Sequence, residues 1–240
     1  SNIHSVEYLS VRDCKSLTGV DANNLSHCNK RSNTVKQLSI FECPALTNIF
    51  NIQGFQEVSC WRCPMLTTIQ GHDHLYKVYV EDCAMLSTIH SSQSIRKLTA
   101  LGKFNLIING LNYPKLSELK IDNPANIPSD VQLCTLGFIR SDVETLPAIE
   151  GLKNLFYIDC PMLKSTPAIN GLKILYLENC SSLTDIQPIG KMNKIYFSRC
   201  PNLNVIPSMY GLKKIYCDDG SITINFDTHE CKTKIMYAST

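Results

Sequence analysis

Apolar residues recur along this chain in a short pattern that repeats about every 20 residues. Three consecutive copies, which begin at Leu152, Leu172 and Met192, read LKNLFYIDCPML, LKILYLENCSSL and MNKIYFSRCPNL. The fourth and sixth residues of each copy are apolar, which is the alternation of a β-strand. One strand per repeat, always in the same phase, predicts parallel strands stacked in register.

The same frame runs through nearly the whole chain, from about residue 5 to residue 219. Its ninth position is cysteine in seven copies: Cys14, Cys43, Cys63, Cys83, Cys160, Cys180 and Cys200. Lys103, Pro124, Ser141 and Gly220 take that position in the other copies. The frame therefore predicts about eleven strands in a single domain, 1–240, and the irregular copies near 103–141 predict a bend or a junction between two regular blocks.

The segments that return from one strand to the next are too short and too rich in proline for full helices. Proline stands there at positions 147, 167, 188 and 207, and it disrupts a helix interior. We expect extended or short 3-10 segments. A 29-residue first interval predicts a polar loop inserted near 15–34. The alternation of Ile222, Ile224 and Phe226 predicts a capping strand within 220–240, because an end repeat needs its open core covered.

Composition indicates a folded chain with no bias toward charged partners. Of the 240 residues, 44% are hydrophobic and 18% are charged, and the net charge is +2. That charge is too small to make nucleic acid the expected partner. No run of 18 apolar residues is present, so we expect no membrane insertion. A monomer is expected.

The twelve cysteines follow the repeat rather than a pairing scheme. The ninth-position cysteines are predicted to form a buried column, one per repeat, and Cys60 and Cys217 take inward strand positions. Buried cysteines pack as small apolar residues. Free thiols favour a reducing compartment.

Several short motifs could carry chemistry, but each has a structural explanation. Cys60-Trp61-Arg62-Cys63 is a C-x-x-C sequence, yet both cysteines fall in core positions. Two further groups, His72-Asp73-His74 and Asp227/His229/Cys231, could hold a metal but lack further ligands. No nucleophile elbow, phosphate loop or metalloprotease motif occurs. We therefore predict no catalysis, no cofactor and no metal site.

The outward strand positions hold the candidate binding residues. Four consecutive repeats place an aromatic residue at the middle of the strand: Phe156, Tyr176, Tyr196 and Tyr216. Further outward candidates are Ile139, Ile158, Ile174, Trp61, Tyr79 and Phe41. Neighbouring aromatics can simply stabilise a sheet, or they can form a protein interface, since aromatic centres with charged rims are typical of interfaces.

The repeat resembles the leucine-rich repeat, L-x-x-L-x-L-x-x-N/C-x-L. The resemblance implies a leucine-rich repeat solenoid with a parallel β-sheet on one face, extended or short 3-10 return segments and little α-helix. Such a solenoid is expected to be a non-catalytic protein-protein interaction module.

The short repeats, with I-P or T-P in the return, resemble those of secreted bacterial effector proteins. That resemblance implies virulence through a eukaryotic host protein, in the host cytoplasm after secretion. Two alternatives remain: the repeat region of a plant-type immune receptor, whose repeats also read C-P-x-L, and the targeting domain of a larger enzyme.

Overall fold

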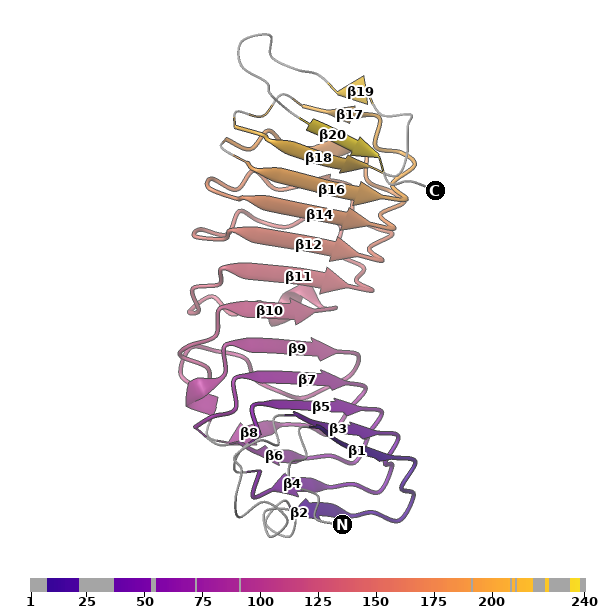
Figure 1. Cartoon of the computed structure of the whole chain (residues 1–240), viewed down its shortest axis with the longest axis vertical. Helices are drawn as coiled ribbons and strands as arrows, with labels where there is room; N and C mark the ends of the chain where they lie inside the picture. Colours follow the sequence, from indigo (N-terminus) through magenta and orange to yellow (C-terminus); the bar gives the residue numbers. More distant parts are fainter. Residues whose placement is uncertain are drawn as a thin grey trace, which may run out of the picture. The chain divides into compact units, whose positions relative to one another are not determined.

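The chain forms two compact units (Figure 1). Unit 1 comprises Ser1–Ser117 with Asn126–Val131, and unit 2 comprises Glu118–Ala125 with Gln132–Thr240. The boundary falls in the stretch that lacks the repeated cysteine. The structure is a computed structural model that describes residues 8–21, 37–52, 55–71, 73–90, 92–190, 192–207, 209, 211–217, 223–224 and 234–237.

Unit 1 is a solenoid built around five parallel strands. In order across the sheet they are β1 (Tyr8–Arg12), β3 (Gln37–Phe41), β5 (Glu57–Trp61), β7 (Lys77–Glu81) and β9 (Lys97–Leu101). The return segments form a second parallel sheet of three-residue strands: β2 (Gly19–Asp21), β4 (Asn48–Phe50), β6 (Thr68–Gln70) and β8 (Thr88–His90). Each of the first four coils contributes one strand to each sheet, and the core lies between the two sheets.

Unit 2 repeats this plan. Its main sheet consists of β10 (Glu118–Ile121), β11 (Thr135–Ile139), β12 (Asn154–Ile158), β14 (Ile174–Glu178), β16 (Lys194–Ser198), β18 (Lys214–Cys217) and β20 (Lys234–Tyr237). The return strands pair two by two: β13 (Ser165–Thr166) with β15 (Asp185–Ile186), and β17 (Val205–Ile206) with β19 (Thr223–Ile224). All of these pairings are parallel.

The hydrophobic pattern explains which face of each strand is buried. The second and fourth residues of the strands point inward, and pairs such as Leu175 and Leu177 are fully buried. Register is strict, so Leu155, Leu175, Ile195 and Ile215 stand side by side across four strands. Among the described residues, the helical segments are two single 3-10 turns, η2 (Ser92–Ser94) and η3 (Pro124–Asn126). The predicted fold class, a parallel β-solenoid of the leucine-rich-repeat type with little helix, is confirmed, with five main strands in unit 1 and seven in unit 2.

The recurring Cys-Pro-x-Leu sequence forms a tight turn after four main strands, β3, β5, β12 and β16. The Leu66 amide donates to the Cys63 carbonyl over 3.0 Å, and Leu163 does the same to Cys160 over 3.2 Å. Proline favours the second position of such a turn because its φ angle is already set. The cysteine thiol turns inward and donates to the last carbonyl of its own strand, as Cys63 does to Trp61 over 3.4 Å.

The residue before each of these cysteines adopts a left-handed backbone conformation. Seven residues share it, with φ from 51° to 56°: Asp13, Glu42, Arg62, Asp82, Asp159, Asn179 and Arg199. The amides of the first six donate to the final carbonyl of the next strand, for example Asp159 to Glu178 over 2.9 Å. These residues thus extend the hydrogen bonding between neighbouring main strands by one residue. A non-glycine residue in the left-handed region is, however, strained by about 1–2 kcal/mol.

Three expectations differ from the structure or lie outside it. Cys14, the first of the column, is half-buried rather than buried. Of the predicted capping residues, Ile224 lies in β19 on the return side, whereas β20 pairs with β18 in the main sheet. Ile222, Phe226 and most of the predicted loop insertion near 15–34 lie outside the described residues.

Candidate protein-binding face

Unit 2 carries a continuous row of four aromatic rings on its outer sheet face. Phe156, Tyr176, Tyr196 and Tyr216 are the third residues of their strands and stand directly beside one another in register. Their ring centroids are 5.9, 5.8 and 4.3 Å apart, and the last two rings are parallel within 2°. We call these four residues the unit 2 ladder. Only the Tyr196 and Tyr216 rings stack face to face, the other two neighbouring pairs are tilted by 34–38°, and all four residues are half-buried.

A glycine gives this ladder a cationic end. Gly137 stands between Lys120 and Phe156 in register. A side chain there would crowd Lys120, because a Cβ atom on Gly137 would lie 3.0 Å from Cγ of Lys120. Lys120 instead crosses the glycine and places its ammonium 5.7 Å from the Phe156 ring centroid. This is within cation–π range.

The three predicted isoleucines flank the ladder on both sides. Ile139 and Ile158 are the last residues of β11 and β12 and stand opposite each other, and Ile174 begins β14 next to Lys194. All three are half-buried. The outer face of unit 2 therefore combines half-buried aromatic and aliphatic side chains.

A hydrogen bond fixes one of the ladder's hydroxyl groups. Tyr176 donates to Oε2 of Glu178 over 2.9 Å. Burial and the neighbouring Tyr216 raise the pKa of Tyr196, while the Lys214 ammonium lowers it, and the net shift is upward. The Tyr196 phenol is therefore neutral at physiological pH and available as a hydrogen-bonding group.

Lysines line the edge at which the unit 2 strands begin. We call Lys153, Lys173, Lys194, Lys213 and Lys214 the lysine edge. Backbone hydrogen bonds from Lys173 to Lys153 (2.7 Å) and from Lys213 to Asn193 (3.0 Å) stack these positions on successive coils. Four of the five are exposed and Lys194 is half-buried. Within the part of the chain that the structure describes, none of them forms an ion pair.

Unit 1 has a shorter aromatic row on its own sheet face. Phe41 and Trp61, opposite each other in register, stack at 4.3 Å and 4°, and Tyr79 lies 4.8 Å from Trp61 at a tilt of 38°. We call these three residues the unit 1 ladder. The Arg12 guanidinium caps it 4.5 Å from the Phe41 centroid. Trp61 was predicted to be exposed, but it is half-buried because its two aromatic neighbours lie against its ring.

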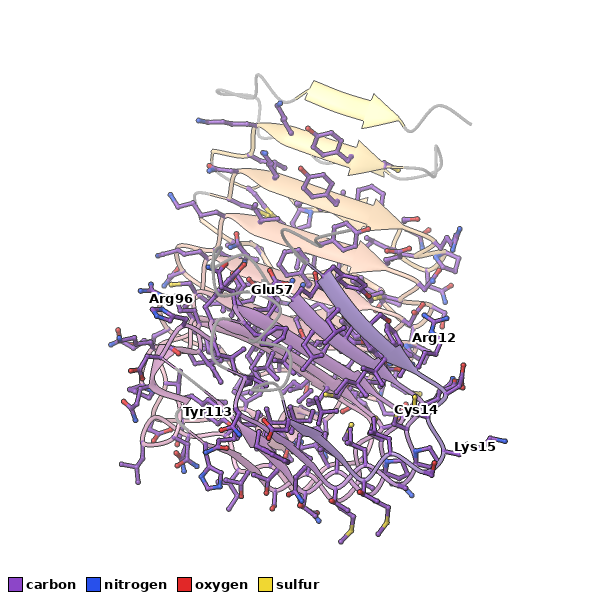
Figure 2. All side chains as sticks on the ribbon, turned by 60° about the horizontal axis from the view of Figure 1, so that its bottom comes forward. Arg12, Cys14, Lys15, Glu57, Arg96 and Tyr113 are labelled. Carbon is purple, nitrogen blue, oxygen red and sulfur yellow. The ribbon has the colours of Figure 1, made fainter. Side chains whose placement is uncertain are left out.

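The two edges of the unit 1 sheet carry different charged groups. Figure 2 shows Glu57 and Arg96 where the strands begin, and Arg12 with Cys14 and Lys15 where they end. Glu57 accepts hydrogen bonds from the Tyr76 hydroxyl (2.7 Å) and the Lys77 ammonium (2.8 Å). On the strand-end side, Arg62 and Glu42 form an exposed ion pair at 2.7 Å.

Most of the described cysteines are buried packing residues, whereas Cys134 is exposed and Cys14 is half-buried. All ten that the structure describes are free thiols. A hydrogen bond with Cys83 and burial raise the pKa of Cys63, burial raises that of Cys60, and burial raises that of Cys160 to about 11. Because the thiolate is the nucleophile and metal ligand, the C-x-x-C sequence at Cys60–Cys63 is poorly suited to redox or metal chemistry.

The other candidate chemical groups lie partly outside the structure. His72, Asp227, His229 and Cys231 are not among the described residues. Within those that are, no cluster of three or more His, Cys, Asp or Glu side chains could hold a metal ion. The described helical turns include none with the length and apolarity needed to cross a membrane.

Sequence reasoning identified the aromatic rows but missed what completes them. The cation at the end of the unit 2 ladder comes from Lys120, two strands away from Phe156, and a glycine on the intervening strand leaves room for the contact. A small residue between a lysine and an aromatic at the same strand position is the signal that could have revealed it. The position of the five lysines of the lysine edge, at the start of the strands, could also have been predicted from the repeat spacing.

Comparison with known proteins adds little to this description. The sequence matches no protein-family model and no curated protein. Among solved structures, it is similar to a leucine-rich repeat protein from Bacteroides ovatus ATCC 8483. The two chains are 13% identical, the alignment covers 98% of this chain and 86% of that one, and the TM-score is 0.31. At that level of similarity, the assignment of the fold rests on the coils of the present chain.

Proposed function

We propose that this protein is a non-catalytic interaction module that binds a partner protein on the outer sheet face of unit 2. The observation that carries the proposal is the unit 2 ladder, four consecutive half-buried aromatic residues flanked by isoleucines and bordered by charge. Solenoids commonly bind through the surface formed by their stacked repeats. The unit 1 ladder, with Phe41, Trp61 and Tyr79, is proposed as a second contact surface on its own unit.

Sheet stability alone is a weak explanation for the composition of this face. A cross-strand aromatic pair contributes roughly 0.2–1 kcal/mol, and inward pairs such as Leu175 and Ile195 already form the buried core. Tyrosine and phenylalanine supply large contact area with few rotatable bonds, so ordering them on binding costs little entropy. Here that entropy is already reduced, because stacking and the Tyr176–Glu178 hydrogen bond hold the rings before a partner arrives.

The setting of this binding is a separate proposal. The 20-residue repeats and free thiols support a bacterial effector that acts on a host protein in a reducing compartment such as the host cytoplasm. The plant-type immune receptor and the targeting domain of a larger enzyme are the alternatives. The sequence of the complete gene distinguishes them, because a flanking catalytic or receptor domain would exclude a stand-alone effector.

The binding proposal is tested by selecting peptides from a displayed library on the immobilised wild-type protein. Each recovered peptide is then measured against Tyr176→Ala with Tyr196→Ala. We expect the double variant to lose at least tenfold in affinity, about 1.4 kcal/mol, while it still unfolds cooperatively.

Met162→Ala is the matched control, since Met162 is an exposed apolar residue of the turn outside the strand face (43% exposed). Its affinities should equal those of the wild type. Recovered peptides that bind the double variant as tightly as the wild type would place the binding surface elsewhere and refute the proposal.

A further inference from the structure

Lysines stand directly opposite one another where the last strands of unit 2 begin. Register pairs Lys194 with Lys214 and Lys214 with Lys234. Like charges in directly opposite positions destabilise a sheet. The first residue of the preceding strand, β14, is Ile174. The first residues of β14, β16, β18 and β20 therefore include no carboxylate that could offset the charge of the lysines.

In unit 1 the same row contains a carboxylate, and Lys77 there also stands opposite Lys97. There Glu57 pairs with Lys77 in register, and its two oxygens accept from Tyr76 and Lys77 at 2.7 and 2.8 Å. Burial of Glu57 raises its pKa, but the hydrogen bonds from Lys77 and Tyr76 outweigh that effect and lower it. A carboxylate held between a lysine and a tyrosine is therefore a stable arrangement on this scaffold.

We propose that the lysine edge and the unit 2 ladder together bind an acidic polypeptide segment, whose carboxylates supply what Glu57 supplies in unit 1. The inference rests on the protein-binding function proposed above and specifies the chemistry of the partner. Lys194 and Lys214 contact the carboxylates, while Tyr196 and Tyr216 offer hydroxyls and ring edges beside them.

The tyrosines support carboxylate recognition independently of the lysines. In three places the chain satisfies a tyrosine hydroxyl with one of its own glutamates: Tyr76 with Glu57, Tyr79 with Glu81, and Tyr176 with Glu178. In β16 the residue in register with Glu178 is Ser198, which has no carboxylate. Aromatic ring edges also carry partial positive charge, which favours a nearby anion.

The stacking geometry argues against other anionic polymers. Single-stranded nucleic acids bind aromatic surfaces by stacking bases on exposed ring faces. The Tyr196 and Tyr216 rings cover each other at 4.3 Å, and the other two neighbouring pairs are tilted by 34–38° at 5.8–5.9 Å, so the ladder offers no row of parallel open ring faces. Strands lie about 4.8 Å apart, and β12 to β18 therefore span about 14 Å. An extended peptide of about four or five residues covers that distance.

The probe for this inference is a fluorescein-labelled random copolymer of glutamate and tyrosine, followed by fluorescence anisotropy. Lys214→Glu recreates the opposed Lys–Glu pair of unit 1, next to Lys194. We expect it to weaken copolymer binding at least tenfold and to leave the thermal midpoint equal to or above that of the wild type. Lys115→Glu, an equal charge change at an exposed lysine of unit 1, should bind like the wild type.

The alternative results separate this inference from the proposed function. Copolymer binding that is absent in the wild type or unchanged in Lys214→Glu overturns the acidic-segment inference, and the selected peptides that depend on Tyr176 and Tyr196 then still support the proposed function. Heparin or oligo(dT) of matched charge that binds as tightly as the copolymer also overturns it, in favour of a general polyanion surface.

Discussion

A single thiol shows how this chain uses reactive residue types for packing. Cys160 turns away from solvent at the end of β12, donates to the carbonyls of Ile158 (3.5 Å) and Phe138 (3.6 Å), and begins the turn that leads to the return segment. Its inward position could be predicted from the repeat spacing. The left-handed residue before it could not, because Asp159 is not one of the glycines that usually mark such a conformation.

The buried thiols should make the protein sensitive to alkaline pH. Burial raises the pKa of Cys160 from 9.0 to about 11, so the unfolded chain releases this proton at a lower pH than the folded one. The contribution to stability is complete below about pH 9 and is lost as pH rises toward about 11. Urea unfolding at about pH 7.5 and about pH 10 should show the loss, and Cys160→Ala should make it smaller. An equal pH dependence in both proteins would contradict this account.

One buried hydroxyl is expected to cost stability. The Tyr157 side chain is fully buried in the core of unit 2, and its oxygen has no hydrogen-bond partner among the described residues. Leaving such a group unsatisfied costs about 1–3 kcal/mol. Tyr157→Phe should therefore raise the free energy of unfolding, whereas Tyr176→Phe, which removes a satisfied hydroxyl, should not. Chemical denaturation measures both, and a destabilised Tyr157→Phe would show that the hydroxyl has a partner.

At the scale of the element, one coil of about 20 residues is the unit of construction. Each coil provides a main strand, a turn that contains cysteine in seven copies, and a return segment, and its backbone bonds to the neighbouring coils, as Lys173 does to Lys153. The alternation of apolar residues predicted the strands and their inner faces. It could not predict the short return strands, since two or three residues such as Asp185 and Ile186 carry too little pattern.

Removal of one whole coil should therefore preserve the fold. Deleting residues 161–180 joins Cys160 to Ser181 and recreates the turn Cys-Ser-Ser-Leu that the chain already contains at Cys180. We expect a β-type circular dichroism spectrum and cooperative unfolding at a lower temperature, because fewer interfaces remain between repeats. Deleting only residues 161–170 puts the strands out of phase and should abolish cooperative unfolding. If the two deletion variants were equally folded, or equally unfolded, the result would contradict the claim that one coil is the unit of construction.

At the scale of the whole molecule, function is proposed to lie on the faces that the core does not use. The aromatic candidates were visible in the sequence because a strict repeat converts spacing into neighbours in space, as for Tyr196 and Tyr216. The capping of each ladder by Lys120 or Arg12 depends on side-chain reach and was not predicted. The identity of the partner could not be predicted from the sequence pattern, because it depends on a complementary surface that belongs to another molecule.

The central claim is that the unit 2 ladder is a binding surface, and hydroxyl-radical footprinting of the protein with a selected peptide tests it most directly. Oxidation rates are measured residue by residue with and without the peptide. The account predicts severalfold slower oxidation of Phe156, Tyr176, Tyr196 and Tyr216, with Met162 unchanged. Unchanged rates along the ladder, together with protection of residues elsewhere, would contradict it.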